Sequence, residues 1–111
     1  MYKIKFIAVG DCFITRHIGF LESEKIKKIN QLINKAEVKF LSFEMTTSSE
    51  RAFLSAFRGG TWAKVSPEIL NDIKALGFNL ISWANNHSLD YLHQGVTDTV
   101  RNFGRFRCIC F

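Results

Sequence analysis

Three short polar clusters in this sequence hold residue types that bind metal ions or move protons. Gly10-Asp11 follows one apolar run, and Glu44 follows a second. The third cluster, residues 85–90 with the sequence Asn-Asn-His-Ser-Leu-Asp, follows a third apolar run. Because open parallel sheets bind ligands at the carboxyl edge that their strands share, the three clusters predict one common site.

The residue types at this predicted site suit a hard divalent cation and proton transfer. Asp11, Glu44 and Asn86 would supply two carboxylates and an amide oxygen, which favours Mn²⁺ or Mg²⁺, with iron or zinc if histidines join from elsewhere. Glu44 could bridge two metal ions, as two-metal hydrolytic sites require. His87 could protonate a leaving oxygen or stabilise phosphoryl charge, and Asp90 is close enough to orient it.

Each cluster also has a structural explanation of its own. Gly10-Asp11 after a strand is a common turn sequence. Taken alone, Glu44 at a strand end is equally well explained as a metal ligand or as a solvated carboxylate. Asn85 and Asn86 could form a turn beside a locally satisfied histidine. The repetition of the pattern after three apolar runs favours the site.

The apolar runs predict buried parallel strands at residues 3–9, 38–43 and 78–83, with Gly10-Asp11 breaking the first. Residues 105–111 resemble a fourth strand. A long stretch, residues 45–62, is expected to be a functional loop that is partly helical. We expect Trp62 to anchor this loop and Trp83 to lie in the core. His17 and His93 fit no motif and are expected at the surface.

Helix signals separate these strands. Ser23 is expected to cap a helix that ends near Lys35, and residues 66–68, Ser-Pro-Glu, to begin one that ends at Gly77. Apolar residues at helical spacing within 96–103 predict a third helix. The β-α-β-α-β-α order predicts an α/β fold with a mostly parallel sheet and right-handed crossovers.

Composition narrows the class of protein. A chain of 111 residues with 47% hydrophobic and 23% charged residues is typical of one globular domain. Cys12, Cys108 and Cys110 are odd in number and lack a Cys-x-x-Cys pair, so we expect neither a disulfide framework nor a cysteine zinc site. The longest apolar runs fall short of the ~20 residues of a membrane helix, and no signal peptide precedes the first strand. We therefore expect no membrane segment in this chain and a cytoplasmic location.

Three motifs resemble the CapA-type capsule and poly-γ-glutamate biosynthesis proteins, a branch of the calcineurin-like metallophosphoesterase superfamily. Gly10-Asp11 with Arg16 resembles the family's Gly-Asp-x-x-x-x-Arg, and residues 42–44, Ser-Phe-Glu, resemble its Asn-Leu-Glu. Residues 84–91, Ala-Asn-Asn-His-Ser-Leu-Asp-Tyr, resemble its Ala-Asn-Asn-His-x-x-Asp-Tyr-Gly block, the most specific of the three. The resemblance covers residues 3–103.

The resemblance implies roles for individual residues. Asp11 would bind a metal ion, Glu44 would bridge, and Asn86 would bind the second ion, with Mn²⁺ as the first expectation. His87 would be the catalytic histidine, assisted by Asp90. Arg16 and Asn85 would contact an anionic polymer or phosphoester substrate.

The departures from the family concern both single residues and the extent of the fold. Phe13 stands where classical metallophosphoesterases have a metal-binding histidine, Ser42 replaces the usual Asn, and Leu92 stands where Gly normally follows Tyr91. The family's later histidine motifs are absent. We therefore expect the N-terminal half of a four-layer α/β/β/α fold, truncated at the C-terminus, with a complementing chain as a candidate partner for the missing half.

Three functions compete on these observations. The first is a metallophosphoesterase-type protein of capsule synthesis whose site is incomplete in this chain, so that its status as an enzyme stays open. The second is an inactive truncated or frameshifted fragment. The third is a small basic polyanion-binding module, which rests on the net charge of +5 alone, since no nucleic-acid motif is present.

Overall fold

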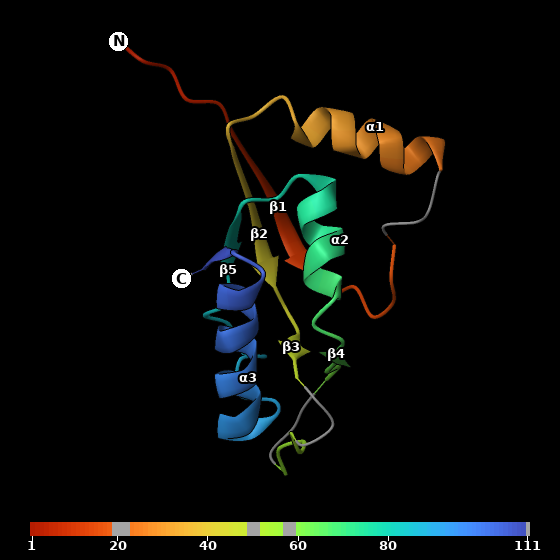
Figure 1. Ribbon diagram of the computed structural model, residues 1–111, viewed down its shortest axis with the longest axis vertical. Helices are drawn as coiled ribbons and strands as arrows, with labels where there is room; N and C mark the ends of the chain where they lie inside the picture. Colours follow the sequence, from red (N-terminus) through yellow and green to blue (C-terminus); the bar gives the residue numbers. More distant parts are fainter. Residues whose placement is uncertain (19–22, 49–51, 57–59, 111) are drawn as a thin grey trace.

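The structure, a computed structural model, describes residues 1–18, 23–48, 52–56 and 60–110. A four-stranded parallel sheet and three helices make up most of it, and a pair of two-residue strands lies beside them (Figure 1). The strands of the main sheet are, in spatial order, β1 (Phe6–Cys12), β2 (Val38–Phe43), β5 (Leu80–Ser82) and β6 (Ile109–Cys110), and the pair consists of β3 (Thr46–Thr47) and β4 (Lys64–Val65). The helices are α1 (Glu24–Ile33), α2 (Ile69–Leu76) and α3 (Leu92–Arg105). This architecture confirms the predicted α/β class and its parallel sheet.

The order of the strands places all three helices on one face of the sheet. The four strands lie side by side in chain order, so every crossover runs in the same direction. Right-handed crossovers that run in one direction all pass over the same face. Figure 1 shows α2 and α3 in front of the strands, with α1 beside α2. The opposite face of the sheet therefore carries no helix from the described parts of the chain.

Alternation along the strands separates the two faces. Leu41, Phe43 and Ile81 are almost fully buried under the helices. Phe40 alternates with them, and its ring stacks on that of Phe6 with centroids 6.4 Å apart. We call the helix-free side the open face, and its apolar side chains are Phe6, Val38, Phe40, Leu80 and Ile109. Parallel sheets are normally covered on both faces, which makes this exposed apolar surface unusual.

Local sequence signals explain the helix ends. The Ser23 hydroxyl accepts a hydrogen bond from the Ile26 amide at 3.2 Å, as an N-cap does. Gly77 ends α2 at a φ of +108°, a left-handed conformation that favours glycine. All three predicted helices are confirmed, although α1 ends at Ile33, before Lys35, and α2 begins at Ile69, just after the Ser-Pro-Glu motif.

The prediction for the first strand was wrong at both of its ends. β1 begins at Phe6 and runs through Gly10-Asp11 to Cys12, so this dipeptide lies within the strand. The pairing with β2 is irregular between Ala8 and Asp11, where two residues of β1 oppose one residue of the partner. A β-bulge accommodates an extra residue in one strand, so Gly10-Asp11 disturbs the pairing without ending β1.

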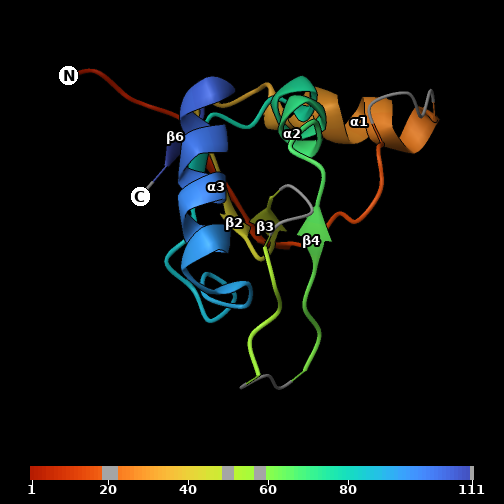
Figure 2. The ribbon, with the colours of Figure 1, turned by 60° about the horizontal axis from the view of Figure 1, so that its bottom comes forward.

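The long 45–62 stretch also differs from its prediction. In its described parts there is no helix, and Thr46 and Thr47 pair in parallel with Lys64 and Val65. Figure 2 shows the chain after β3 and before β4 extending away from the main sheet. Trp62 in this extension is 36% exposed, and its assignment as an anchor stays a prediction.

The predicted fourth strand is confirmed in part: β6 pairs in parallel with β5, but it covers only Ile109–Cys110, and Arg105 ends α3. Trp83 is buried, as expected. Cys12, Cys108 and Cys110 are free cysteines. His17 and His93 are exposed, as expected. Among the described residues, none of the helices combines the length and apolar character needed to cross a lipid bilayer.

Candidate functional site

The carboxyl edge of β1 and β2 brings the first two polar clusters together. The register pairs Asp11 with Ser42 and Cys12 with Phe43, and the Glu44 amide donates to the Cys12 carbonyl at 3.1 Å. Paired residues of neighbouring strands point to the same side of a sheet, so Asp11 and Ser42 both belong to the open face. The predicted convergence of the first two clusters at one edge is thus confirmed.

Glu44 is buried just after the end of β2, and a residue of that strand holds its carboxylate. The Ser42 hydroxyl donates to Oε1 of Glu44 at 2.6 Å. Residues two apart in a strand lie on the same face, which brings this pair together. A charge-assisted hydrogen bond of this length fixes the carboxylate and offsets part of the cost of burying it.

The loop after β5 is built by its own polar side chains. The side-chain amide of Asn85 donates to the Phe43 carbonyl at 2.8 Å and its oxygen accepts the His87 amide at 3.0 Å. The Ser88 hydroxyl accepts the Asn85 amide at 3.2 Å and lies against the carbonyl oxygens of Trp83 and Asn85. These bonds tie the loop to β2 and give it one conformation.

The loop presents His87 between two carboxylates. Its Nδ1 lies 2.7 Å from Oδ2 of Asp90, and its Nε2 lies 3.8 Å from Oε2 of Glu44. The side chains of His87, Asp90 and Glu44 are 17%, 20% and 11% exposed. The side-chain nitrogen of Asn86 lies 3.4 Å from the same Nε2. The expectation that Asp90 would orient His87 is therefore confirmed.

The remaining predicted site residues lie in less direct positions. Asp11 is exposed at the end of β1, next to Ser42 rather than in contact with His87. Arg16 is exposed in the connection that follows β1. Both ends of the Asn85 side-chain amide bind the protein itself, so its contact with a substrate stays a prediction.

The donor set fits a hard cation only in part. The carboxylates of Asp11 and Glu44 and the amide oxygen of Asn86 are ligand types that suit Mn²⁺ or Mg²⁺, and they follow neighbouring strands of one sheet. Within the described ranges, however, no group of three or more His, Cys, Asp or Glu side chains is close enough to hold a metal ion. The assignment of these residues as metal ligands stays a prediction.

Sequence reasoning missed three structural supports of this site. Ser42 was noted only as a departure from the family motif, although its spacing from Glu44 could have revealed the pair. Ser88, three residues after Asn85, has the spacing of a side chain that closes a turn. The Trp83 indole donates to the Met45 carbonyl at 2.7 Å, a contact between distant residues that no local pattern signals.

One position of the loop has a backbone that suits glycine. Leu92, which stands where the resembled family has Gly, has a φ of +55°. Left-handed backbone is costly for a residue with a Cβ atom. Leu92 therefore holds a backbone conformation that glycine would adopt more readily.

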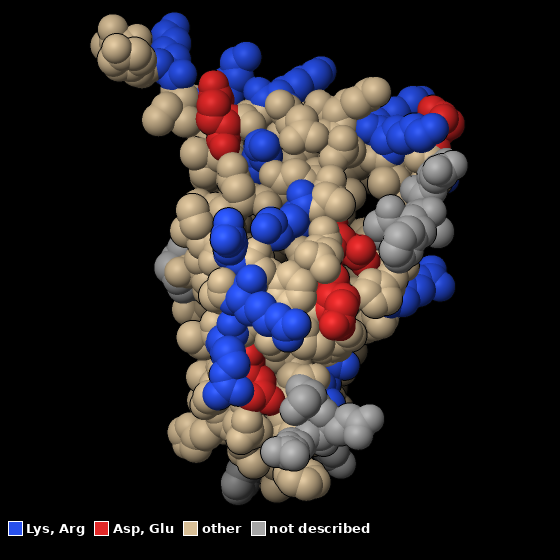
Figure 3. Space-filling model, viewed as in Figure 1, with Lys and Arg blue, Asp and Glu red and all other residues tan. Residues whose placement is uncertain are grey.

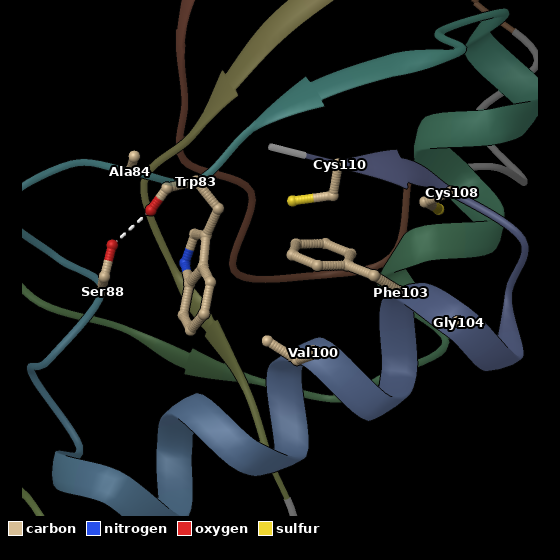
Figure 4. Close-up of a pocket in the computed structure, with 8 residues that line it drawn as sticks. All are labelled: Trp83, Ala84, Ser88, Val100, Phe103, Gly104, Cys108 and Cys110. Carbon is tan, nitrogen blue, oxygen red and sulfur yellow. Dashed lines mark hydrogen bonds between the residues drawn. The ribbon is translucent and has the colours of Figure 1, made fainter.

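A hollow of about 490 Å³ lies on the helix side of this loop. Figure 4 shows Trp83 and Phe103 along it, with Cys110 beside the Phe103 ring and Val100 on α3 below. The Trp83 and Phe103 rings meet edge to face, with centroids 5.8 Å apart. The hollow is mostly apolar, so its chemistry differs from that of the polar edge at Glu44 and His87.

Comparison with known proteins identifies the family. Residues 5–108 match the family described as bacterial capsule synthesis protein PGA_cap, which extends the likeness beyond Phe103, where the sequence motifs alone had ended it. Two uncharacterized proteins of Sinorhizobium fredii (strain NBRC 101917 / NGR234), y4sH and y4uA, are each 36% identical over 98 residues. The match covers 86% of this chain and 21% of each relative, so the chain spans about a fifth of their length. On this evidence, the chain belongs to the bacterial capsule synthesis protein family.

Proposed function

We propose that this chain carries one part of a metal-dependent phosphoesterase-type site of a CapA-like capsule synthesis protein. The observation that carries the proposal is the position of His87, held by Asp90 on one ring nitrogen and directed at Glu44 with the other. The proposed substrate is a phosphoester or an anionic polymer.

In this proposal His87 is the proton donor. An Nδ1–H donated to Asp90 leaves Nε2 directed at the edge where the substrate would lie. When Nε2 is protonated, it can give its proton to a leaving oxygen or stabilise negative charge on a phosphoryl group. Asp90 holds the ring in this orientation and balances the charge of the imidazolium.

Asp11, Glu44 and Asn86 are the proposed metal ligands. A bound divalent cation would supply Lewis-acid polarisation of a phosphoryl oxygen and would offset repulsion between the two carboxylates. Mn²⁺ is our first choice, with Mg²⁺, iron or zinc as alternatives. Arg16 and Asn85 are proposed to contact the anionic part of the substrate.

Metal titration tests the ligand assignment. We expect Mn²⁺ to bind the purified chain weakly, since no group of three or more His, Cys, Asp or Glu side chains among the described residues is close enough to hold a metal ion. Glu44→Gln and Asp11→Asn should each weaken this binding about tenfold or more, measured by calorimetry. The matched control is Glu24→Gln, which removes an exposed carboxylate on α1. Equal Mn²⁺ affinity in all four proteins would contradict the proposed metal site.

A second part of the proposal concerns the open face. We propose that a complementing polypeptide layer covers Phe6, Phe40 and Ile109 and brings the missing ligands to the edge. Two observations support it: Phe6 and Ile109 are 59% and 66% exposed, and the relatives are about five times longer than their matched region. Parallel sheets are normally buried on both faces.

Co-expression tests this covering layer. The part of the y4sH protein outside its matched 98 residues should co-purify with this chain. Phe6→Asp should abolish the complex because it places a charge in an apolar interface. Phe53→Asp is the matched control, since Phe53 is 76% exposed but lies outside the open face. Failure of the wild-type chain to form a complex would contradict this part of the proposal.

The two competing functions make different predictions. Without its covering layer, the chain alone should lack catalysis, which the inactive-fragment alternative also expects; restoration of activity in the complex would distinguish them. The polyanion-binding alternative has less support. Its support is the net charge of +5 and, on the face shown in Figure 3, a band of Lys and Arg side chains left of centre with acidic side chains beside it.

A further inference from the structure

A buried carboxylate on α2 holds the segment that carries Arg16. Oδ2 of Asp72 accepts the Ile18 amide at 2.9 Å and lies 3.1 Å from Nδ1 of His17. Asp72 is only 6% exposed, whereas the His17 side chain is 46% exposed. Both contacts span more than fifty residues of sequence, so they fix the segment to a distant helix rather than shape a local turn.

The same segment is fixed again on the other side of Arg16. The Cys12 carbonyl accepts the Glu44 amide at 3.1 Å, and the Ile14 amide lies 3.0 Å from the sulfur of Met45. Arg16 is therefore held between an anchor at Ile14 and a second anchor at His17. Only Thr15 separates the Ile14 anchor from Arg16, and the His17 anchor follows Arg16 directly, so the backbone at Arg16 has little freedom.

Burying the Asp72 carboxylate costs free energy, which its hydrogen bonds must offset. A buried carboxylate is unfavourable unless charged or polar donors satisfy it. Among the described residues, the donors to Asp72 are the Ile18 amide and the His17 ring, and both come from the Arg16 segment. Helix α2 already buries Ile69, Leu70 and Ile73, so an apolar residue at position 72 would extend its core face. The Asp72 carboxylate therefore binds the Arg16 segment and contributes little to the apolar core.

We propose that Asp72 and His17 are positioning residues that hold Arg16 for an anionic group of the substrate. The inference rests on the role of Arg16 given under the proposed function. The inference also explains the position of Arg16. The Arg16 segment leaves the carboxyl edge directly after Asp11 and Cys12, and the hydrogen bonds to Asp72 keep it from moving away from that edge. Asp72 itself contacts no substrate.

Trypsin measures the anchor directly because it cleaves after Arg16. In Asp72→Asn and in His17→Ala, cleavage at this bond should be about tenfold faster, since weakening a hydrogen bond to a charged group favours local opening by about that factor. His17→Asn should restore slow cleavage, because its side-chain amide can donate from a position close to that of Nδ1. His17 is exposed, so its variants test the anchor even if Asp72→Asn folds poorly.

Asp98→Asn is the matched control for Asp72→Asn. Asp98 is also a buried helix carboxylate, and it accepts hydrogen bonds from Ser48 at 2.5 Å and Gln94 at 2.7 Å. Its variant should leave the rate of cleavage after Arg16 unchanged, and cleavage after Lys39 in the central strand β2 provides an internal reference for global unfolding. Unchanged cleavage after Arg16 in both Asp72→Asn and His17→Ala would overturn the anchor.

Inorganic phosphate with Mn²⁺ separates the anchor from the function it serves. In the wild-type chain phosphate should slow cleavage after Arg16, and Asp72→Asn should weaken this protection while Mn²⁺ affinity stays unchanged. A variant that lost Mn²⁺ binding to the same extent would show a general structural role and overturn the positioning role. Absence of phosphate protection in the wild-type chain would overturn the anion contact of Arg16, whereas the cleavage rates would still decide whether the anchor exists.

Discussion

Oδ2 of Asp90 lies 2.7 Å from Nδ1 of His87, and both side chains are about four-fifths buried. This contact joins residues three apart in the loop after β5 and determines which ring nitrogen is left for chemistry. Because Nδ1 is occupied, Nε2 is the atom directed at Glu44. The orientation of the ring is therefore a property of the loop rather than of a bound ligand.

Removing Asp90 should change the tautomer of His87. At neutral pH we expect the proton on Nδ1 in the wild-type chain, and a shift toward Nε2 in Asp90→Ala, because the acceptor at Nδ1 is lost. Nitrogen-15 NMR of the imidazole measures both states, and the exposed His93 serves as an internal reference. The variant should also lose roughly 1–3 kcal/mol of unfolding free energy. A neutral ring with its proton on Nε2 in the wild-type chain would refute the proposed orientation.

Leu92→Gly should stabilise the chain. Leu92 has a φ of +55° and is 47% exposed, so glycine relieves the left-handed backbone while little buried surface is lost. We expect a gain of up to about 1 kcal/mol in the free energy of unfolding, measured in urea. Leu89→Gly is the control: Leu89 is also exposed but has a negative φ, and glycine there should destabilise the loop by about 0.5–1 kcal/mol. A loss at both positions would contradict the strain at Leu92.

Two glycines of α3 should respond in opposite directions to alanine. A Cβ at Gly95 would lie 2.6 Å from Cβ of Tyr91 and 3.1 Å from Cγ2 of Thr46, so Gly95→Ala should cost about 1–3 kcal/mol. A Cβ at Gly104 would meet nothing within 4 Å, and Gly104→Ala should gain about 0.5–1 kcal/mol from helix propensity. Thermal unfolding of the two variants measures both changes, and the melting temperature should fall for Gly95→Ala and rise for Gly104→Ala. Similar melting temperatures would contradict the close packing of α3 against β3.

Cys12 should make the chain less stable in alkali. Burial raises the pKa of its thiol from 9.0 to about 11. Between these pH values the unfolded chain loses this proton while the folded chain keeps it, so the thiol's contribution to stability is complete below pH 9 and is lost as pH rises to 11. We expect the difference in unfolding free energy between wild type and Cys12→Ala to shrink over that interval. A constant difference would show that Cys12 ionises normally in the folded chain.

The parts of the fold that follow from local signals were the ones that sequence predicted. Ser23 and Gly77 mark helix ends through their own conformational preferences, and β2 coincides with its apolar run, residues 38–43. The Asn-His loop was found because its ligands are adjacent in sequence. In each case a few neighbouring residues hold all the information.

The parts that sequence missed depend on partners far along the chain. The bulge that keeps Asp11 inside β1 is set by pairing with β2. The β3–β4 pair joins two-residue strands that show no periodicity of their own. Asp72 gave no sign of its contact with His17, because an acid in an amphipathic helix is usually solvated.

The chain-order arrangement of the strands also bears on how the protein folds. A ribosome makes β1 first, and each later strand of the main sheet pairs with the strand made before it. The sheet can therefore grow from one edge during synthesis, without an early strand waiting for a late partner. Paired segments stay within one crossover of each other, which keeps the loops that must close short and favours rapid folding.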